Sequence, residues 1–282
     1  MDLDALKQWI GRTETLQDHI TLAPLQALAA TLDRDDPPPG PGDEVAPGGQ
    51  WLYFLPLHPL RAISTDGHPT RGGFLPPVPL PRRMWAASRM ELRHALRAGS
   101  AVTRTSRIAD VSAKQGRSGR LVFVRVHHEI SDAHGVAITE DQDIVYREMA
   151  QTGETPPAAP AARTDEQFSR RITPDPVLLF RYSALTFNGH KIHYDRPYCL
   201  EAEGYPGLVV HGPLIATLLT DLLRRERPEA RLVKFAFTAV RPVFDSNRFQ
   251  VCGKPGEEPG SFKLWACDHE GALTMKADAE IA

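Results

Sequence analysis

The stretch HGPLIATLLTDLLRR, residues 211–225, decides the fold. From Leu214 onward its leucines and isoleucine repeat at i, i+1, i+4, i+5, i+8 and i+9, which makes one broad apolar helix face. Pro213 falls in the first helical turn, where proline is tolerated. We therefore predict a helix over 213–225 that is buried against a sheet. Strand-like segments follow it, with alternating apolar residues over 233–239 and shorter segments near 249–252, 262–267 and 273–277.

The first half of the chain also contains strand-like segments, at 85–96, 101–112, 120–130 and 136–146. Gly99, Gly116–Gly119 and Ala133–Gly135 separate them by short turns, which favours an antiparallel meander. A long helix is not visible before these strands, and proline takes its place: twelve of the 25 prolines lie between Pro37 and Pro81. Proline excludes a central strand over 51–81, so we expect a rigid cover over a sheet face. Two unequal copies of one architecture are predicted.

The remaining segments connect or precede these two copies. Residues 2–34 show apolar stripes at helical spacing, 33–50 read as a loop, 151–164 as a polar Pro/Ala linker, and Val177–Tyr182 as a short strand. The predicted organisation is an N-terminal helical segment and loop (1–50), a first module (51–150), a linker (151–172) and a second module (173–282).

Composition excludes several classes of protein. With 33 Lys+Arg against 35 Asp+Glu, the net charge of −2 gives no general attraction to nucleic acid. The sequence has no apolar run of membrane-spanning length and no signal-peptide core at its start. Cys199, Cys252 and Cys267 form no CxxC and leave an odd count, which fits a reducing compartment. We expect a soluble cytoplasmic protein.

Residues suited to chemistry gather between Phe180 and Gly212. Asn188, His190, His193, Asp195 and His211 fall within 24 residues. Asn188–Gly189 predicts a tight turn, and Asp195 is an expected N-cap for a short helix to about Ala202. The turn would point Asn188 and His193 into one small volume.

The start of the predicted helix completes this arrangement. Gly212 carries no side chain, and the free N–H groups at a helix N-terminus suit a carbonyl oxygen that gains negative charge. A general acid/base beside such an oxyanion site is what proton chemistry next to a carbonyl needs. Any one of these histidines alone could be an ordinary turn residue, but the cluster favours a site.

Two motifs, Asn188-Gly-His190-Lys-Ile-His193-Tyr-Asp195 and Gly207-Leu-Val-Val-His211-Gly212, resemble the MaoC-like (R)-specific hydratase/dehydratase superfamily. The most similar group contains fatty-acid-synthase-type dehydratases, mitochondrial 3-hydroxyacyl-thioester dehydratases and mesaconyl-C4-CoA or itaconyl-CoA hydratases. The resemblance implies an α+β double hotdog fold with a degenerate first copy. It also implies a hydro-lyase that reversibly adds water to an α,β-unsaturated acyl-CoA thioester.

The resemblance also implies roles for single residues. By its motif Asp-x-Asn-x-x-His, His193 takes the histidine position, His190 the asparagine position and Asn188 the aspartate position. An amide cannot take a proton at neutral pH, so we expect Asn188 to hold the water and His193 to move its proton.

Further residues are expected to bind the substrate or its oxyanion. The segment around His211 and Gly212 would polarise the thioester carbonyl, and Gly207, His190 and Arg181 are assigned to substrate binding. We expect no metal and no cofactor apart from the coenzyme A of the substrate, and a homodimer is expected.

Alternatives remain open at this stage. A metal site could be built from His190, His193, Asp195 and His211, although the turn residues argue against it. A hotdog thioesterase or a non-catalytic acyl-thioester-binding subunit would share the fold. The acyl group and its carrier, coenzyme A or acyl carrier protein, are not fixed by sequence. A C5 diacid would need an arginine, for which Arg181 and Arg241 are candidates.

Overall fold

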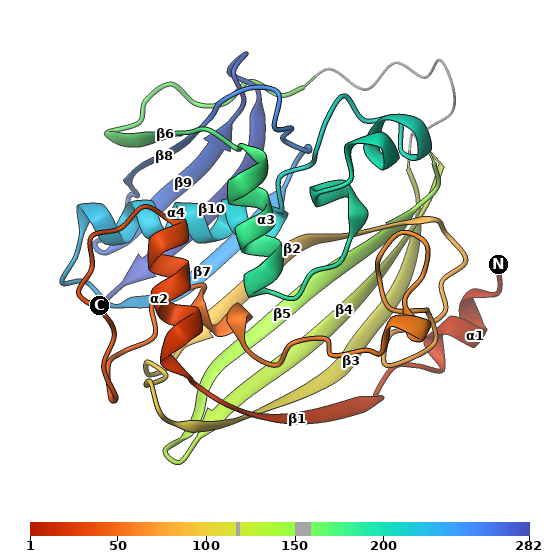
Figure 1. Cartoon of the computed structure of the whole chain (residues 1–282), viewed down its shortest axis with the longest axis horizontal. Helices are drawn as coiled ribbons and strands as arrows, with labels where there is room; N and C mark the ends of the chain where they lie inside the picture. The colour runs from red at the N-terminus through yellow and green to blue at the C-terminus, as the bar shows by residue number, and fades with distance from the viewer. Residues whose placement is uncertain (117–118, 150–158) are drawn as a thin grey trace.

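The computed structural model describes residues 1–116, 119–149 and 159–282. Its strands form one antiparallel ten-stranded sheet in the order β1-β3-β4-β5-β2-β7-β10-β9-β8-β6 (Figure 1). The pairing of β2 with β7 joins a half made of β1–β5 to a half made of β6–β10, as Ala87↔Thr238 and Glu91↔Lys234 show. The strands are β1 Thr13–His19, β2 Arg82–Leu92, β3 Ala101–Gly116, β4 Gly119–Asp132, β5 Gly135–Arg147, β6 Phe168–Ile172, β7 Leu232–Ala239, β8 Phe249–Pro255, β9 Ser261–Cys267 and β10 Leu273–Ile281.

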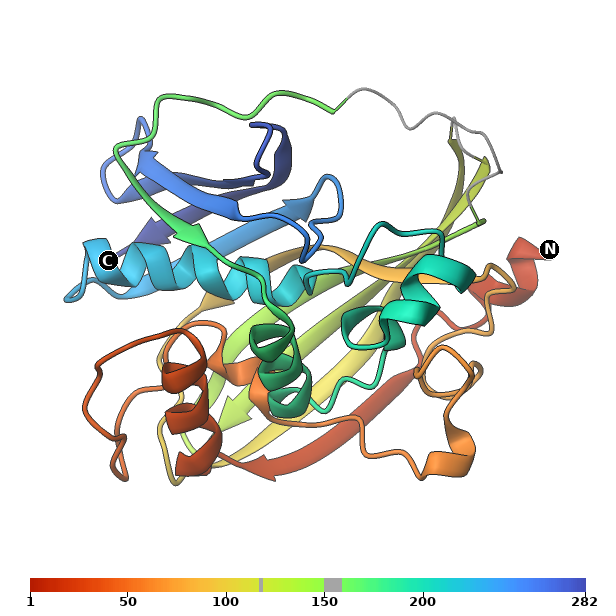
Figure 2. The same ribbon diagram turned by 45° about the horizontal axis from the view of Figure 1, so that its top comes forward.

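The second half wraps the helix that the sequence predicts, α4 (Gly212–Glu226), which contacts β6, β8, β9 and β10. All ten residues from Leu214 to Leu223 are buried. The sheet covers one side of α4, while the N-terminal helix α2 (Leu22–Thr31) and α3 (Pro176–Leu185) lie on its other side (Figure 2). A sheet that wraps one long buried helix is a hotdog, and the fold is a double hotdog of the α+β class.

The first half has no long helix in the equivalent place. Its proline-rich segment, residues 51–81, carries only short 3-10 turns, Gly49–Leu52 and Leu60–Ala62. Leu52, Tyr53 and Phe54 nevertheless belong to the main core, and Val78 and Leu80 pack with valines of β3 and β4. The expectation of a cover over a sheet face is confirmed.

Two predicted elements are wrong. Residues 13–19, expected to be helical, form the edge strand β1, which pairs with β3 from Thr13↔Arg107 to His19↔Ala101. The side chains of β1 alternate between exposed and half-buried, as in a strand, so this alternation outweighs the weak helical stripe. Val177–Tyr182 is not a strand but lies in α3, because Asp175 caps the helix through Leu178 N (2.8 Å) and Pro176 opens it.

The chain also forms a short helix, α1 (Leu3–Lys7), and a π-helical turn, Tyr198–Ala202. Within the described ranges, no helix is long and apolar enough to cross a membrane. The turn expected within Gly116–Gly119 and most of the linker 151–164 fall on residues 117–118 and 150–158, outside the described residues.

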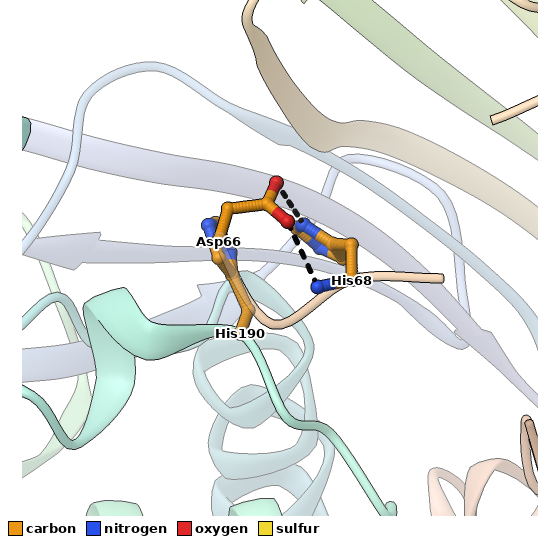
Figure 3. A group of neighbouring side chains, drawn as sticks. All are labelled: Asp66, His68 and His190. Atoms are coloured by element: carbon orange, nitrogen blue, oxygen red, sulfur yellow. Dashed lines mark hydrogen bonds and ion pairs between the residues drawn. The ribbon is translucent and has the colours of Figure 1, made fainter. Parts of the chain in front are cut away.

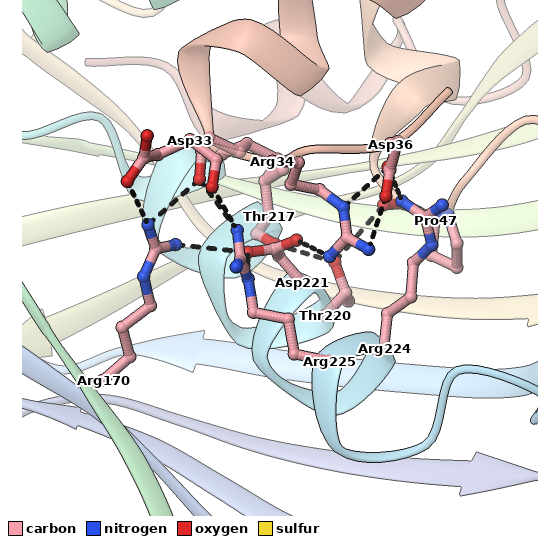
Figure 4. Close-up of polar contacts among 11 residues, drawn as sticks. Asp33, Arg34, Asp36, Pro47, Arg170, Thr217, Thr220, Asp221, Arg224 and Arg225 are labelled. Atoms are coloured by element: carbon pink, nitrogen blue, oxygen red, sulfur yellow. Dashed lines mark hydrogen bonds and ion pairs between the residues drawn. The ribbon is translucent and has the colours of Figure 1, made fainter. Parts of the chain in front are cut away.

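A polar network fastens the N-terminal segment to α4 (Figure 4). The carboxylate of Asp221, on α4, accepts from Arg34 (2.7 Å), Arg225 (2.8 Å) and Arg170 (3.3 Å). Arg225 and Arg170 also bond to the carbonyl of Leu32, just past the end of α2. Buried charge is stable only when it is paired, so this network fixes how α2 lies over α4.

Candidate active site

The segment from Asn188 to Asp195 is shaped by hydrogen bonds that its own residues make. Asn188 Oδ1 accepts from the backbone N–H of His190 (3.0 Å), which closes the tight turn that the sequence predicts. Lys191–His193 then form a 3-10 turn, and Asp195 Oδ1 accepts from Tyr198 N (3.1 Å) at the start of the π-helical turn. The predicted turn and cap are both present, and between them they present His193 to the interior.

His193 has one ring nitrogen fixed and one free. Its Nδ1 lies 2.7 Å from the carbonyl of Val209, and because a carbonyl only accepts, Nδ1 carries the hydrogen. Among the described residues, Nε2 has no partner. Burial lowers the pKa of His193 to about 4, with the carbonyl bond opposing the shift and His68 adding to it. His193 is therefore neutral at pH 7, with the lone pair of Nε2 available as a base.

His211 lies directly against His193, with ring centroids 3.6 Å apart and an interplanar angle of 16°. Its Nε2 bonds to Ser183 Oγ on α3 (2.8 Å), whereas no described residue pairs with its buried Nδ1. Burial, and then the neighbouring imidazoles of His193 and His190, hold its pKa well below the usual value. The side chain of His211 thus packs against the face of the His193 ring and holds that ring in place.

The backbone after His211 starts α4. Ile215 N donates to His211 O (3.1 Å), while the N–H groups of Gly212 and Leu214 have no acceptor among the residues described. These donors, at the positive end of a fifteen-residue helix, lie next in the chain to the stacked imidazoles. They can stabilise an oxygen that becomes negative.

A loop from the proline-rich segment reaches this site, although no local sequence pattern predicted it there. His68 lies with its ring centroid 3.9 Å from that of His190, which in turn is 5.5 Å from His193 (Figure 3 shows Asp66, His68 and His190). We call His68, His190, His193 and His211 the imidazole cluster. The only sequence signal for the loop was an Asp-Gly-His motif at 66–68 within a region read as a cover.

One arginine faces the same region. Arg83 pairs across the sheet with the buried Tyr146, and its charge lowers the pKa values of His68 and His190 after the larger effect of burial. Its neighbours are engaged: Arg82 binds Glu203 (2.9 Å), and Arg71 donates to the carbonyls of Val78 and Pro81. For Arg83, no ion pair is formed with any described carboxylate.

Other expected site residues lie elsewhere. Arg181 is exposed and its guanidinium approaches Ala30 O of α2 (3.5 Å), so the structure does not bring it to the imidazole cluster. Arg241 pairs with Asp268 (3.2 Å). Gly207 lies against the Asp245 carboxylate, at a place where a Cβ would come within 2.6 Å of Oδ1, so it shapes the loop before His211 rather than the site itself.

The histidines of β4 are also separate from the site. His127 bonds to Asp141 (2.8 Å) on one face, and His128 to Ser106 (2.8 Å) on the other. Cavities of about 250 and 300 Å³ open beside α4, lined in part by Leu223, Arg227 and Leu232 and by Leu25, Pro37 and Thr217, and none of the imidazole cluster lines them.

The four-residue metal site that the sequence left open does not fit this geometry. Among the residues described, no three of these four side chains bring their ligand atoms within 4.8 Å of one another, and Asp195 caps the next turn. A different trio, Asp66, His68 and His190, has its potential ligand atoms within 4.8 Å of one another. Within this trio His68 Nδ1 donates a hydrogen bond to Asp66 Oδ2 (3.0 Å), so these two residues form a hydrogen-bonded pair.

A double hotdog with a neutral, oriented imidazole beside a helix N-terminus defines a protein built to act on an acyl thioester. The family model described as hydroxyacyl-thioester dehydratase type 2 matches residues 48–245. The chain belongs to that family, and it is a hydro-lyase that adds or removes water at an acyl-CoA thioester.

Three relatives illustrate the similarity. The chain is 44% identical over 273 residues to mesaconyl-C(4)-CoA hydratase of Chloroflexus aurantiacus, covering 97% of this chain and 96% of the relative. It is 27% identical to the mitochondrial hydroxyacyl-thioester dehydratase type 2 of Schizosaccharomyces pombe, over 84% and 88% of the two chains. The crystal structure of HtdX of Mycobacterium tuberculosis matches with a TM-score of 0.66 at 17% identity, covering 96% of this chain and all of that one (100%).

Proposed function

We propose that this protein hydrates the CoA thioester of a short unsaturated dicarboxylic acid, of the mesaconyl-C4-CoA type. The observation that carries the reaction is His193, a buried neutral imidazole whose Nδ1 is bonded to Val209 O and whose Nε2 is free. The similarity of 44% over nearly the whole chain to a mesaconyl-C(4)-CoA hydratase supports the choice of acyl group. A thioesterase would need an activated water at the thioester carbon, whereas the matching family model is described as a dehydratase.

The reaction uses two features of the site. The N–H groups of Gly212 and Leu214 polarise the thioester carbonyl, so that negative charge moving from the C2=C3 bond is held on its oxygen. His193 Nε2 takes one proton from water as the water oxygen bonds to C3, and then delivers that proton to C2 on the same face. The atoms of one water are added, and His193 ends neutral as it began.

Arg83 is the group that we assign to the distal carboxylate of the acyl chain. Charged hydrogen bonds from a guanidinium to a carboxylate are strong, and the site offers it no protein carboxylate among the described residues. This replaces Arg181 and Arg241, which the structure places elsewhere.

The experiment is an assay of the purified protein with crotonyl-CoA, mesaconyl-C4-CoA and itaconyl-CoA. Loss of enoyl absorbance with CoA still esterified is the expected result, fastest with mesaconyl-C4-CoA. Release of free thiol would instead identify a thioesterase. We further propose that activity needs no added cofactor, which dialysis against a chelator tests, and that the protein is a homodimer, which light scattering tests.

A further inference from the structure

The site as described holds the attacking water through one acceptor only, His193 Nε2. Water that must attack C3 in a fixed direction needs a second acceptor, because one hydrogen bond leaves it free to rotate. Asn188 was expected to fill this role. Its acceptor atom, Oδ1, is directed back onto His190 N (3.0 Å) within its own turn, and its amide nitrogen can only donate.

The loop carrying Asp66 and His68 is docked on the same segment in a way that allows little movement. Lys191 N donates to Asp66 O (2.9 Å), and Ser64 N donates to His68 O (2.7 Å). Gly67 has a φ of +89°, and a Cβ there would come 1.8 Å from Gly189 O. Only glycine fits at this approach, so the sequence of the loop is matched to the turn that presents His193.

Asp66 orients His68 (Figure 3). Its Oδ2 lies 3.0 Å from His68 Nδ1, and its Oδ1 accepts from the backbone N–H of His68 (3.0 Å). The hydrogen of a neutral His68 is therefore on Nδ1, and Nε2 carries a lone pair. The His68 side chain is 20% exposed.

We propose that His68, oriented by Asp66, is the second acceptor of the hydratase site, and that it holds the water that His193 deprotonates. This rests on the proposed function. One hydrogen of the water goes to His193 and then to C2. The other stays on oxygen, hydrogen-bonded to His68 Nε2, and becomes the hydrogen of the new 3-hydroxyl group. In the reverse direction His68 accepts the hydrogen bond of the substrate hydroxyl.

The surroundings of His68 favour its neutral form, which can accept a hydrogen bond at Nε2. Burial lowers its pKa, the hydrogen bond to Asp66 opposes this, and the positive charges of Arg83 and Arg71 lower it further. Burial disfavours the charge of Asp66, yet the hydrogen bonds from His68 hold the pKa of its carboxyl below the usual value. A neutral imidazole beside an ionised carboxylate keeps its Nε2 lone pair at pH 7.

The test compares His68→Leu with His68→Gln, whose side-chain carbonyl can still accept a hydrogen bond. We expect H68L to lose about 100-fold in kcat on the best enoyl-CoA, the order found when one preorganised hydrogen bond is removed, with KM within about threefold. H68Q should recover a large part of this loss. Asp66→Asn should lose about tenfold in kcat. The matched control is His58→Leu, an exposed histidine of the same proline-rich segment, which should leave both constants unchanged.

Several outcomes would overturn the inference. It fails if H68L keeps wild-type kcat while His193→Gln is inactive, in which case the proposed function stands. It also fails if H68Q is as slow as H68L, or if the loss appears in His190→Gln instead. If the wild type binds one equivalent of zinc and H68L binds none, His68 is a metal ligand and not an acceptor for water. A wild type that hydrates no enoyl thioester overturns the proposed function itself, and this inference with it.

Discussion

At the scale of single residues, the site depends on imidazoles that stay uncharged. Burial favours the neutral ring of His193 and outweighs the hydrogen bond from Nδ1 to Val209 O, which by itself would favour the charged form. Burial makes His193 a weak base. For the same reason Nε2 is not protonated at neutral pH, and its lone pair stays available. In the proposed reaction the N–H groups at the start of α4 compensate for this weak base, because they would stabilise the negative charge created when water attacks.

His193→Gln should lose activity without loss of the fold. Gln can still donate to Val209 O, but it cannot take a proton, and general acid–base catalysis is worth about 10²–10⁴-fold. The measurement is kcat on mesaconyl-C4-CoA or crotonyl-CoA, with circular dichroism as a check on folding. His134→Gln, on an exposed turn, is the control. A rate within about threefold of wild type would remove His193 from the mechanism.

Arg83→Met should change selectivity rather than general activity. A hydrogen bond to a charged group is worth about 1.5–3 kcal/mol, so kcat/KM for mesaconyl-C4-CoA should fall about 10- to 100-fold. Crotonyl-CoA has no distal carboxylate and should be affected by less than about threefold. Arg89→Met is the control, because Arg89 lies on the same strand and pairs with Asp143 (2.9 Å). An equal effect on both substrates would argue against a carboxylate contact.

The sequence predicted only part of this group of residues. Asn188, His190, His193 and His211 were brought together because local turn and cap signals act within a few residues. His68 and Arg83 come from segments more than a hundred residues earlier. The approach of His68 depends on a fit between Gly67 and Gly189 that no local pattern reveals, and that of Arg83 on the pairing of β2 with β5.

At the scale of elements, α4 is the most predictable and also the most constrained. Its apolar stripe predicted burial against a sheet, and its bounds differ from the prediction by one residue at each end. The sequence did not show that its polar side would be buried too. Thr217, Thr220 and Asp221 are covered by the N-terminal segment, whose strand β1 and helix α2 were predicted as one helical region.

Asp221→Ala should therefore destabilise the protein strongly. It would leave the guanidiniums of Arg34, Arg170 and Arg225 beside one another without their shared carboxylate, whose side chain is only 4% exposed. Breaking a buried ion pair costs about 3–5 kcal/mol. Urea denaturation gives the free energy of unfolding. Asp278→Ala, which removes an exposed pair with Lys263, should cost less than about 1 kcal/mol. If the two variants lose similar free energies of unfolding, the network shown in Figure 4 does not stabilise the fold.

At the scale of the whole molecule, the two halves divide the work. The second half supplies α4, the proposed oxyanion site at its start, and the imidazoles of His190, His193 and His211. The first half, which has no long helix between its strands, supplies a covering segment and from it Asp66 and His68. The asymmetry between the copies was readable from proline content, because proline excludes strands and long helices alike. The sequence did not indicate which residues the covering segment would contact.

The free energy of unfolding should fall steeply as the pH drops from about 6.5 toward 4.5. His128, His190, His193 and His211 are all buried, and burial lowers the pKa of each below its usual value. In the unfolded chain they bind protons near pH 6.5, so between there and their lower native pKa values the unfolded state holds more protons. Stability contributed by the neutral rings is then present above pH 6.5 and lost as the pH falls.

Each such imidazole contributes about 2 kcal/mol of lost stability by pH 5, from about 1.5 pH units at 1.36 kcal/mol per unit. Urea denaturation at pH 7.5, 6.5 and 5.5 measures the effect, and the slope of the unfolding free energy against pH near 5.5 should correspond to an uptake of two to four protons. His128→Asn provides a separate check, since His128 is far from the catalytic segment in sequence and its loss should lower the uptake by about one proton. An uptake near zero would mean that the imidazole cluster is charged or hydrated in the native protein, and the neutral base required of His193 would be lost with it.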